Sequence, residues 1–368
     1  MKCNVPPHIA SLVPYPPGKP LEELEREYGI SGSIKLASNE NPWGPSPKAV
    51  AAIAAALANL HRYPDGSCHY LAQRLAEKLG VRPERLVFGN GSNELILFLA
   101  TAFLRPGDEV VSSHPAFLMY QKIVQVQGGV NRVVPLREMH HDLEAILAAV
   151  TAGTRLIFLD CPNNPCGTII EPRRFEAFLD QLPEDVVVVL DEAYVDFVAP
   201  EQRIDVLAHI RAGRPVVTLR TFSKAYGLAG LRVGYGLMDP AIASLLHRVR
   251  QPFNVNSLAQ VGALAALEDT NHYEKTLAGT RTGMAWLACE VKKLGCRPLP
   301  SHTNFFLIDL GTGAAAIYER LLRLGVIVRP MQPYGFPNHI RITVGTEAEN
   351  RRFVASLAEV LQKGAPND

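Results

Sequence analysis

Between residues 85 and 237, short apolar runs alternate with segments in which apolar residues recur at helical spacing. The runs RLIFLD (155–160) and VVVVLDEAY (186–194) are continuous and rich in β-branched residues, as in strands buried on both faces. The segments 92–104 and 117–127 have the apolar spacing of helices. Further strands are expected at 85–89, 109–113, 130–136, 215–223 and 231–237. This alternation predicts an α/β domain with a largely parallel sheet.

The segments on either side of this region differ from it. The first 40 residues are rich in proline and contain one short helical stretch at 21–29, so we expect an arm rather than a domain. Helices are expected at 47–60 and 67–80, and helical segments dominate 256–295. A smaller α+β piece follows, with elements expected at 303–310, 314–325, 326–330, 339–345 and 347–362. We therefore predict an arm over 1–40, a large domain over 41–256 and a small C-terminal domain over 257–368.

The composition then narrows the classes of function. The 368 residues include 37 Lys and Arg against 36 Asp and Glu, so the chain lacks the basic excess of a nucleic-acid binder. No apolar run approaches the roughly 18 residues of a membrane span, and the proline-rich start lacks the apolar stretch of a signal peptide. The six cysteines form no CxxC and no zinc spacing, which predicts free thiols in a reducing cytoplasm and no metal site.

Four segments with candidate chemistry each follow a predicted strand. In FGNGSNELILFL (88–99), two glycines lead into a helix that starts near Ser92 and Asn93, where free N–H groups and the helix dipole suit a phosphate. The segment CPNNPCGT (161–168) offers the side chains of Asn163 and Asn164 in a rigid turn at the end of a strand. Each segment, taken alone, is also explained by an ordinary turn between two elements, and that alternative stays open.

The other two segments carry charged groups. Asp191 ends the apolar strand of VVVVLDEAYVDF (186–197), where a carboxylate is desolvated unless a cation meets it, and Tyr194 follows. LRTFSKAYGLAGLRVGY (219–235) contains Lys224, whose pKa would fall and whose amine would become nucleophilic on burial. Near Lys224 in sequence lie Thr221, Ser223 and Arg232. The structural alternatives are an aspartate that caps a strand at the surface and a solvated lysine in a loop.

Because all four segments follow strands of a largely parallel sheet, their side chains can meet at one edge. Together they offer an anion site for a phosphate, a carboxylate for a pyridinium nitrogen, an Asn and a Tyr for a phenolic oxygen, and a Lys for a Schiff base. Pyridoxal 5′-phosphate requires this combination of groups.

The combined motifs resemble those of fold-type I aminotransferases of the aspartate aminotransferase superfamily, and within it the histidinol-phosphate aminotransferases. The resemblance runs from about residue 10 to about residue 360. The segments that carry it are LASNENPWGPSP (36–47), HRYPDG (61–66), NNPCGT, DEAYVDF, RTFSKAYGLAGLRVGY and HIRITVGT. It implies a large domain with a mostly parallel seven-stranded sheet between helices, and a smaller α+β C-terminal domain.

The resemblance also assigns roles to individual residues. Lys224 would form the Schiff base, Asp191 would pair with the ring nitrogen, and Tyr194 would complete the catalytic set. The other expected cofactor contacts are Ser92, Asn93, Thr221, Ser223 and Arg232 at the phosphate, Phe117 stacked on the ring, Asn164 together with Tyr194 at the phenolic oxygen, and Tyr63, which would reach the active site of a partner subunit. Positions that contact substrate are matched by Tyr15, Asn164, Arg329 and Arg341. Cys166 replaces the Thr that is usual in NNPTG, at a turn position that we expect to be structural.

The implied activity is amino transfer between L-histidinol phosphate and 2-oxoglutarate in histidine biosynthesis, by a homodimer with shared active sites. An aromatic amino acid aminotransferase would use the same catalytic residues and stays an alternative. A threonine-phosphate decarboxylase would be a lyase on the same scaffold, which NENPWGPSP fits less well. A cofactor-binding regulator would need a DNA-binding domain, for which 368 residues used by the enzyme fold leave no room.

Overall fold

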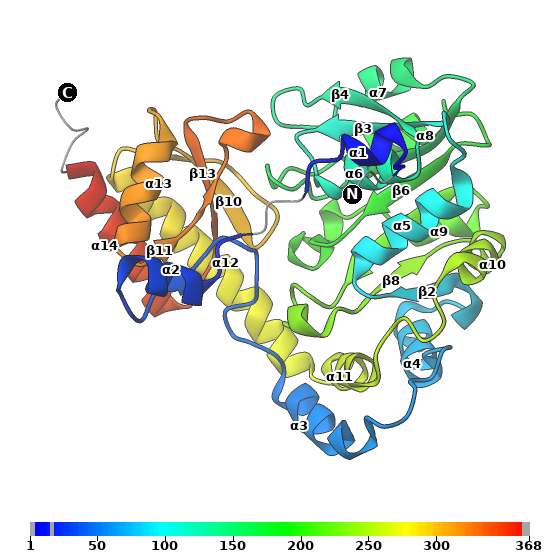
Figure 1. Ribbon diagram of the computed structural model, residues 1–368, viewed down its shortest axis with the longest axis horizontal. Helices are drawn as coiled ribbons and strands as arrows, with labels where there is room; N and C mark the ends of the chain where they lie inside the picture. The colour runs from blue at the N-terminus through cyan, green and yellow to red at the C-terminus, as the bar shows by residue number, and fades with distance from the viewer. Residues whose placement is uncertain (1–3, 15–17, 363–368) are drawn as a thin grey trace.

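The computed structural model describes residues 4–14 and 18–362. Its largest sheet has seven strands in the order β2-β8-β7-β6-β5-β3-β4 (Figure 1). Strand β8 runs antiparallel to β2 and β7, and the remaining neighbours pair in parallel. The strands are β2 Leu86–Gly89, β3 Glu109–His114, β4 Val130–Pro135, β5 Thr154–Asp160, β6 Val187–Asp191, β7 Val216–Thr221 and β8 Gly234–Leu237. Each lies within a predicted apolar run or within one residue of it, so the mostly parallel α/β sheet is confirmed.

Helices cover both faces of this sheet, which explains why its strands are apolar throughout. In β6, Val187 and Val189 pack into one core, and Val188 and Leu190 pack into the core on the opposite face. The first core also contains side chains of α5 Ser92–Phe103, α6 Met119–Val126 and α10 Pro240–Val249. The second contains side chains of α3 Pro47–Ala56, α4 His69–Leu79, α7 Leu143–Ala149, α8 Pro172–Leu179, α9 Val206–Arg211 and α11 Ser257–Leu267.

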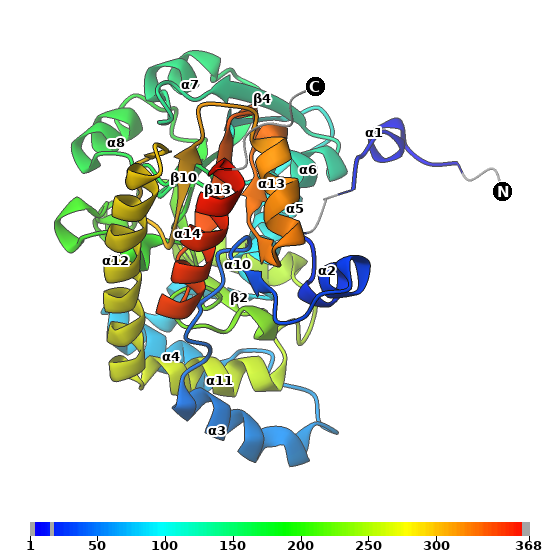
Figure 2. The ribbon, with the colours of Figure 1, turned by 90° about the vertical axis from the view of Figure 1, so that its left-hand side faces the viewer.

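A second, antiparallel sheet lies in the C-terminal part, with the strand order β12-β13-β10-β9. Figure 2 shows three helices side by side in front of it. The strands are β9 Arg297–Pro298, β10 Phe305–Asp309, β12 Arg329–Pro330 and β13 His339–Thr343, and the helices are α12 Thr270–Lys293, α13 Ala314–Arg323 and α14 Glu347–Gln362. In β13, Ile340 and Ile342 pack into the core beneath these helices, so the alternate residue Arg341 points to the other face of the sheet.

The N-terminal residues contact both parts of the molecule. Helix α1 Pro7–Ala10 lies beside α6, where the side-chain amide of Gln125 donates to the His8 carbonyl. Helix α2 Leu21–Tyr28 buries Leu24 against the C-terminal part, and β1 Ile34–Lys35 pairs in parallel with β11 Val326–Ile327. No helix among residues 4–14 and 18–362 is long and apolar enough to cross a membrane.

Candidate active site

A cavity of about 460 Å³ lies where the carboxyl ends of the large sheet face the antiparallel sheet. Twelve of the residues expected from the sequence line it: Ser92, Asn93, Phe117, Asn164, Asp191, Tyr194, Thr221, Ser223, Lys224, Arg232, Arg329 and Arg341. Topology brings them together, because the ends of parallel strands and the start of the antiparallel β8 lie at the same edge. Tyr15 lies outside the described residues.

One end of the cavity has the features of an anion site. Helix α5 begins at Ser92, and its N-cap, Gly91, provides no side chain for the free N–H groups of the first turn. The hydroxyls of Thr221 and Ser223 lie 3.0 Å apart at the end of β7. A Cβ atom at Gly91 would sit 2.6 Å from the Arg232 guanidinium, so the glycine allows this cation to approach the start of the helix. These donors suit a phosphate group.

Lys224 lines the cavity and is partly buried. Its Nζ donates to the Ser38 carbonyl at 3.4 Å and lies 5.6 Å from the centre of the Tyr194 ring. Burial, together with the positive charges of Arg341 and Arg232, lowers the pKa of this amine to about 8. A substantial fraction of the amine is therefore neutral near physiological pH, which is the form that acts as a nucleophile or a base.

Asp191 is a buried carboxylate at the end of β6. Its Oδ2 accepts a hydrogen bond from the Tyr120 hydroxyl at 2.9 Å, and its Oδ1 accepts one from the Ala193 amide at 3.1 Å. Burial raises the pKa of this carboxyl to about 7, and the charge of the neighbouring Asp160 adds to the effect. A cation bound here would stabilise the ionised form, so the site is suited to a positively charged ligand group.

Tyr194 and Asn164 hold polar atoms at the same wall. The Tyr194 hydroxyl accepts a hydrogen bond from the Asn39 side-chain amide at 2.8 Å, and burial raises its pKa to about 12. The side-chain oxygen of Asn164 accepts a hydrogen bond from the Arg341 guanidinium. This hydrogen bond joins strand β13 of the antiparallel sheet to the loop that follows β5 of the large sheet.

Arg329 and Arg341 face each other directly on β12 and β13. The Arg341 guanidinium donates to the Ala37 carbonyl at 3.0 Å and lies 4.8 Å from the centre of the Phe305 ring. Like charges at directly opposed positions repel each other, and an anionic ligand beside them would offset the repulsion. The pair therefore favours an anion on the substrate side of the cavity.

Sequence reasoning missed three residues whose polar side chains form hydrogen bonds with these groups. Tyr120 was not identified because it occupies a buried position of a helix, where the sequence pattern predicts only a core side chain. Asn39 lies within the NENPWGPSP motif, which was used only for the family resemblance. Asp160 also lines the cavity, and its position at the end of the apolar run 155–160 was the signal that could have identified it.

Two further predicted residues lie away from the cavity centre. Tyr63 is 84% exposed and stacks on Phe253, with 5.0 Å between ring centres, so it does not line the cavity of its own chain. Cys166 is buried in a small apolar cluster with Leu307 and Met331, and burial raises the pKa of its thiol to about 12. These surroundings favour the structural role expected for Cys166.

Comparisons with known proteins agree with this geometry. The family described as aminotransferase class I and II matches residues 31–357. The chain is 58% identical to histidinol-phosphate aminotransferase of Desulfotalea psychrophila, over 99% of this chain and 97% of that one. Identity to histidinol-phosphate aminotransferase of Moorella thermoacetica is 48%, over 96% and 92% of the two chains. The crystal structure of histidinol-phosphate aminotransferase from Sinorhizobium meliloti in complex with pyridoxal-5′-phosphate matches with a TM-score of 0.92 and 32% identity, over 99% of both chains. The chain therefore belongs to the class I and II aminotransferases.

Proposed function

We propose that this protein is a pyridoxal 5′-phosphate-dependent histidinol-phosphate aminotransferase, which transfers an amino group between L-histidinol phosphate and 2-oxoglutarate in histidine biosynthesis. The observation that carries the proposal is that one cavity contains a partly buried lysine, a buried carboxylate with few partners and an anion site at a helix start. The histidinol-phosphate aminotransferases at 58% and 48% identity support the choice of substrate.

The residues that line the cavity fit the cofactor. Because Gly91 has no side chain, the Arg232 guanidinium approaches the first turn of α5, so a cation and backbone N–H groups would be available to the phosphate. Asp191 would hold the ring nitrogen, and Phe117 would stack on the ring. Tyr194 and Asn164 would bind the phenolic oxygen. When bound, pyridoxal 5′-phosphate supplies an aldehyde that reacts with amines and a ring that withdraws electrons from the adjacent carbon.

Lys224 would accept the proton from the substrate carbon and return it on the cofactor side. A pKa of about 8 suits an amine that must both accept and donate protons near neutral pH. Asp191 would keep a proton at the ring nitrogen, because an ionised carboxylate in a buried site stabilises a cation beside it. The Tyr194 hydroxyl keeps its own proton, since burial raises its pKa, and so it can donate to an oxygen anion.

The two arginines would bind the two substrates in turn. Histidinol phosphate carries a phosphate and 2-oxoglutarate carries carboxylates, so one site must accept both kinds of anion. A guanidinium does this because its planar N–H groups pair with the oxygens of either group. Arg341 and Arg329, opposed on the antiparallel sheet and lining the cavity, would form this site.

We also propose that the protein acts in the cytoplasm as a homodimer in which Tyr63 contributes to the partner's active site. Tyr63 is one of several large apolar side chains that are exposed between residues 50 and 70; the others are Val50, Leu57, Leu60 and Tyr70. A second copy covering this region would bury them. Chains with Tyr63→Phe mixed with chains with Lys224→Ala test the sharing, because a trans contribution leaves one site of each heterodimer free of both substitutions. Heterodimers with no more activity than the two parent homodimers would count against it.

Steady-state kinetics test the proposed substrate. We expect a higher kcat/KM for histidinol phosphate than for phenylalanine or tyrosine, with glutamate formed from 2-oxoglutarate in equal amount to the keto product. A higher kcat/KM for phenylalanine would favour an aromatic amino acid aminotransferase. Release of carbon dioxide from O-phosphothreonine, without glutamate, would show a decarboxylase instead.

A further inference from the structure

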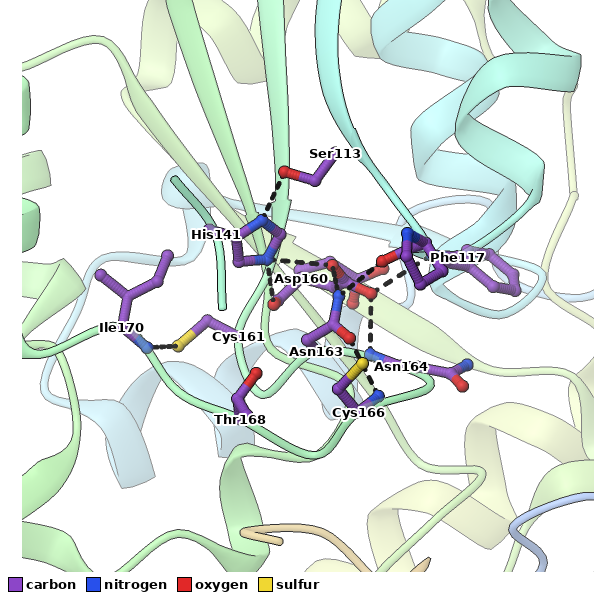
Figure 3. Close-up of polar contacts among 12 residues, drawn as sticks. Ser113, Phe117, His141, Asp160, Cys161, Asn163, Asn164, Cys166, Thr168 and Ile170 are labelled. Carbon is purple, nitrogen blue, oxygen red and sulfur yellow. Dashed lines mark hydrogen bonds and ion pairs between the residues drawn. The ribbon is translucent and has the colours of Figure 1, made fainter. Parts of the chain in front are cut away.

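A buried polar cluster begins at Asp160, which lines the cavity, and continues away from it through His141 and Ser113; the proposed chemistry assigns no role to these three residues. The three residues expose 3%, 5% and 1% of their surface. They come from the end of β5, the segment before α7, and β3. Figure 3 shows the His141 ring between Ser113 and Asp160. Burying so many polar groups is costly unless they are bonded to one another, so the cluster calls for an explanation.

Asp160 accepts hydrogen bonds from two separate loops. Its Oδ2 accepts the backbone N–H of Asn164 at 2.9 Å and that of Phe117 at 3.3 Å. Its Oδ1 accepts the side-chain amide of Asn163 at 3.0 Å (Figure 3). Phe117 lies between β3 and α6, and Asn164 lies between β5 and α8. One carboxylate therefore connects the two loops that carry the expected ring-stacking residue and the expected phenolic-oxygen ligand.

His141 holds Asp160 from the side away from the cavity. Its Nδ1 lies 2.7 Å from the Ser113 hydroxyl oxygen. Its Nε2 lies 2.9 Å from the Asp160 carbonyl oxygen and 3.2 Å from the Asp160 Oδ1. A neutral ring satisfies all of these contacts when Ser113 donates to Nδ1 and Nε2–H donates to Asp160. The imidazole thus links the end of β5 to β3 and restricts the carboxylate to one orientation.

The effect of Asp160 extends to the substrate side through Asn164. The backbone of Asn164 is bonded to Asp160, and its side-chain oxygen accepts a hydrogen bond from Arg341. Asn163 closes the same turn, because its side-chain oxygen accepts the Cys166 amide at 3.0 Å. A displaced Asp160 would therefore move a cofactor ligand and the partner of a substrate-binding arginine together.

We propose that Asp160, held by His141, is a positioning residue that fixes Phe117 and Asn164 for the cofactor and, through Asn164, Arg341 for the substrate. The inference rests on the proposed function for the identity of the ligands, whereas the connection between the loops rests on the bonds above. A carboxylate is required because it accepts N–H donors on both oxygens, while an asparagine would present its own N–H₂ group to one of these donors.

Asp160→Asn keeps the shape of the side chain and tests the proposal. Tyr273→Phe is the matched control, since it removes a hydroxyl that donates to the half-buried Asp196 at 2.7 Å without lining the cavity. We expect the dissociation constant for pyridoxal 5′-phosphate to rise about 10- to 100-fold in Asp160→Asn, the usual effect of losing a hydrogen bond to a charged group. The KM for histidinol phosphate should also rise, while Tyr273→Phe should change neither quantity more than about twofold.

Hydrogen exchange measures the loops without reference to catalysis. In both the cofactor-loaded and the cofactor-free protein, Asp160→Asn should speed exchange in residues 115–120 and 161–168, and the control should not. Unchanged exchange and an unchanged cofactor dissociation constant would overturn the proposal. If Asp160→Asn exchanges faster but the native protein does not use histidinol phosphate, the positioning role is supported and only the proposed substrate is contradicted.

A pair of variants at His141 covers the case in which Asp160→Asn does not fold. The terminal amide of His141→Gln can replace the Nε2–H donor to Asp160, whereas His141→Leu removes it. We expect His141→Leu to reproduce the faster exchange and the weaker cofactor binding, and His141→Gln to restore most of both. Equal behaviour of the two variants would show that only the packing of the ring matters and would overturn the role of Asp160.

Discussion

Strands β5 and β6 each end on a buried carboxylate, and a partly buried lysine follows β7, but these three charged groups differ in how many protein partners they have. Asp160 at the end of β5 accepts hydrogen bonds from Phe117, Asn163 and Asn164 and also contacts His141. Asp191 at the end of β6 accepts hydrogen bonds from Tyr120 and Ala193 and has no cation bound to it among the described residues.

Lys224, which follows β7, resembles Asp191 rather than Asp160. Its Nζ makes one long hydrogen bond, to the Ser38 carbonyl, and its pKa is strongly lowered. A buried charge with few partners costs stability, so a fold keeps it where a ligand completes its surroundings. In the proposed site, the two groups assigned to the cofactor, Asp191 and Lys224, have fewer protein partners than Asp160, which is assigned to positioning.

Replacing Lys224 should have the largest effect. Lys224→Ala removes the group that would transfer the proton, so kcat should fall at least about 10²- to 10⁴-fold. The bound cofactor should then no longer be trapped on the chain by borohydride, as peptide mapping can show. The exposed Lys293 supplies a control, because Lys293→Ala should leave both readouts unchanged. Borohydride labelling of another lysine in the native protein would refute the assignment.

The second largest effect should come from Asp191→Asn, which removes the charge and keeps the shape. We expect kcat to fall about 10²- to 10³-fold, the scale of losing one electrostatic contact to the reacting group. The folded state should be at least as stable as the native protein in the absence of cofactor, because a poorly partnered buried carboxylate is gone. Near-normal turnover in stopped-flow assays would show that Asp191 merely caps its strand.

Arg341→Lys tests the contacts near the end of β5, because Arg341 donates to Asn164 in the loop that follows this strand. Lysine keeps the charge but loses the paired N–H geometry that contacts Asn164 and an anion, so each half-reaction should weaken by about 1.5–3 kcal/mol. Single-turnover rates with histidinol phosphate and with 2-oxoglutarate measure the two halves. Arg297→Lys, on the exposed edge of the same antiparallel sheet, is the control. An effect confined to one substrate would mean that Arg341 does not bind both anions.

Counted per pH unit, the smallest expected effect is on the stability of the cofactor-free protein. Asp191 has a pKa of about 7 in the folded state against an ordinary value of 3.8, so between these values the folded protein holds a proton that the unfolded chain has released. The contribution of Asp191 to the free energy of unfolding should therefore fall as pH rises through this window, by up to about 1.4 kcal/mol per pH unit.

Urea unfolding of the native protein and of Asp191→Asn at about pH 4.5 to about pH 7 measures this contribution as the difference between their free energies of unfolding. Cofactor should flatten the difference, because a cation beside the carboxylate lowers its pKa. A difference that does not change with pH would mean that Asp191 is ionised throughout and has partners that the comparison with Asp160 overlooks.

Much of the candidate site could be predicted because its residues follow recognisable strands. Asp191 and Lys224 stand at the ends of apolar runs, and the topology of a parallel sheet brings such ends together. The sequence did not predict helices α7, α8, α9 and α10, which are short: α10 has ten residues and the other three have eight or fewer. Short helices give few repeats of an apolar pattern, so their periodicity is hard to read.

Asp160 shows where such reasoning ends. In the sequence it closes an apolar run just as Asp191 does, and the two are partners in the register of β5 and β6. Their proposed roles differ because His141, Phe117 and Asn164 contact the carboxylate of Asp160 and not that of Asp191. The contacts with Phe117 and His141 are not encoded by a local pattern, since these residues lie 43 and 19 positions from Asp160 along the chain.

The succession of strands along the large domain, the sheet edge that holds the candidate site, and the lysine and carboxylate that line its cavity could be predicted from the sequence itself, because apolar periodicity and strand-end positions are local properties of the chain. The tertiary structure decided which buried charges have partners and which lack them. It set the pKa values of Lys224 and Asp191, and it placed Arg341 against Asn164. These depend on desolvation and on contacts between distant segments, which exist only once the chain has folded.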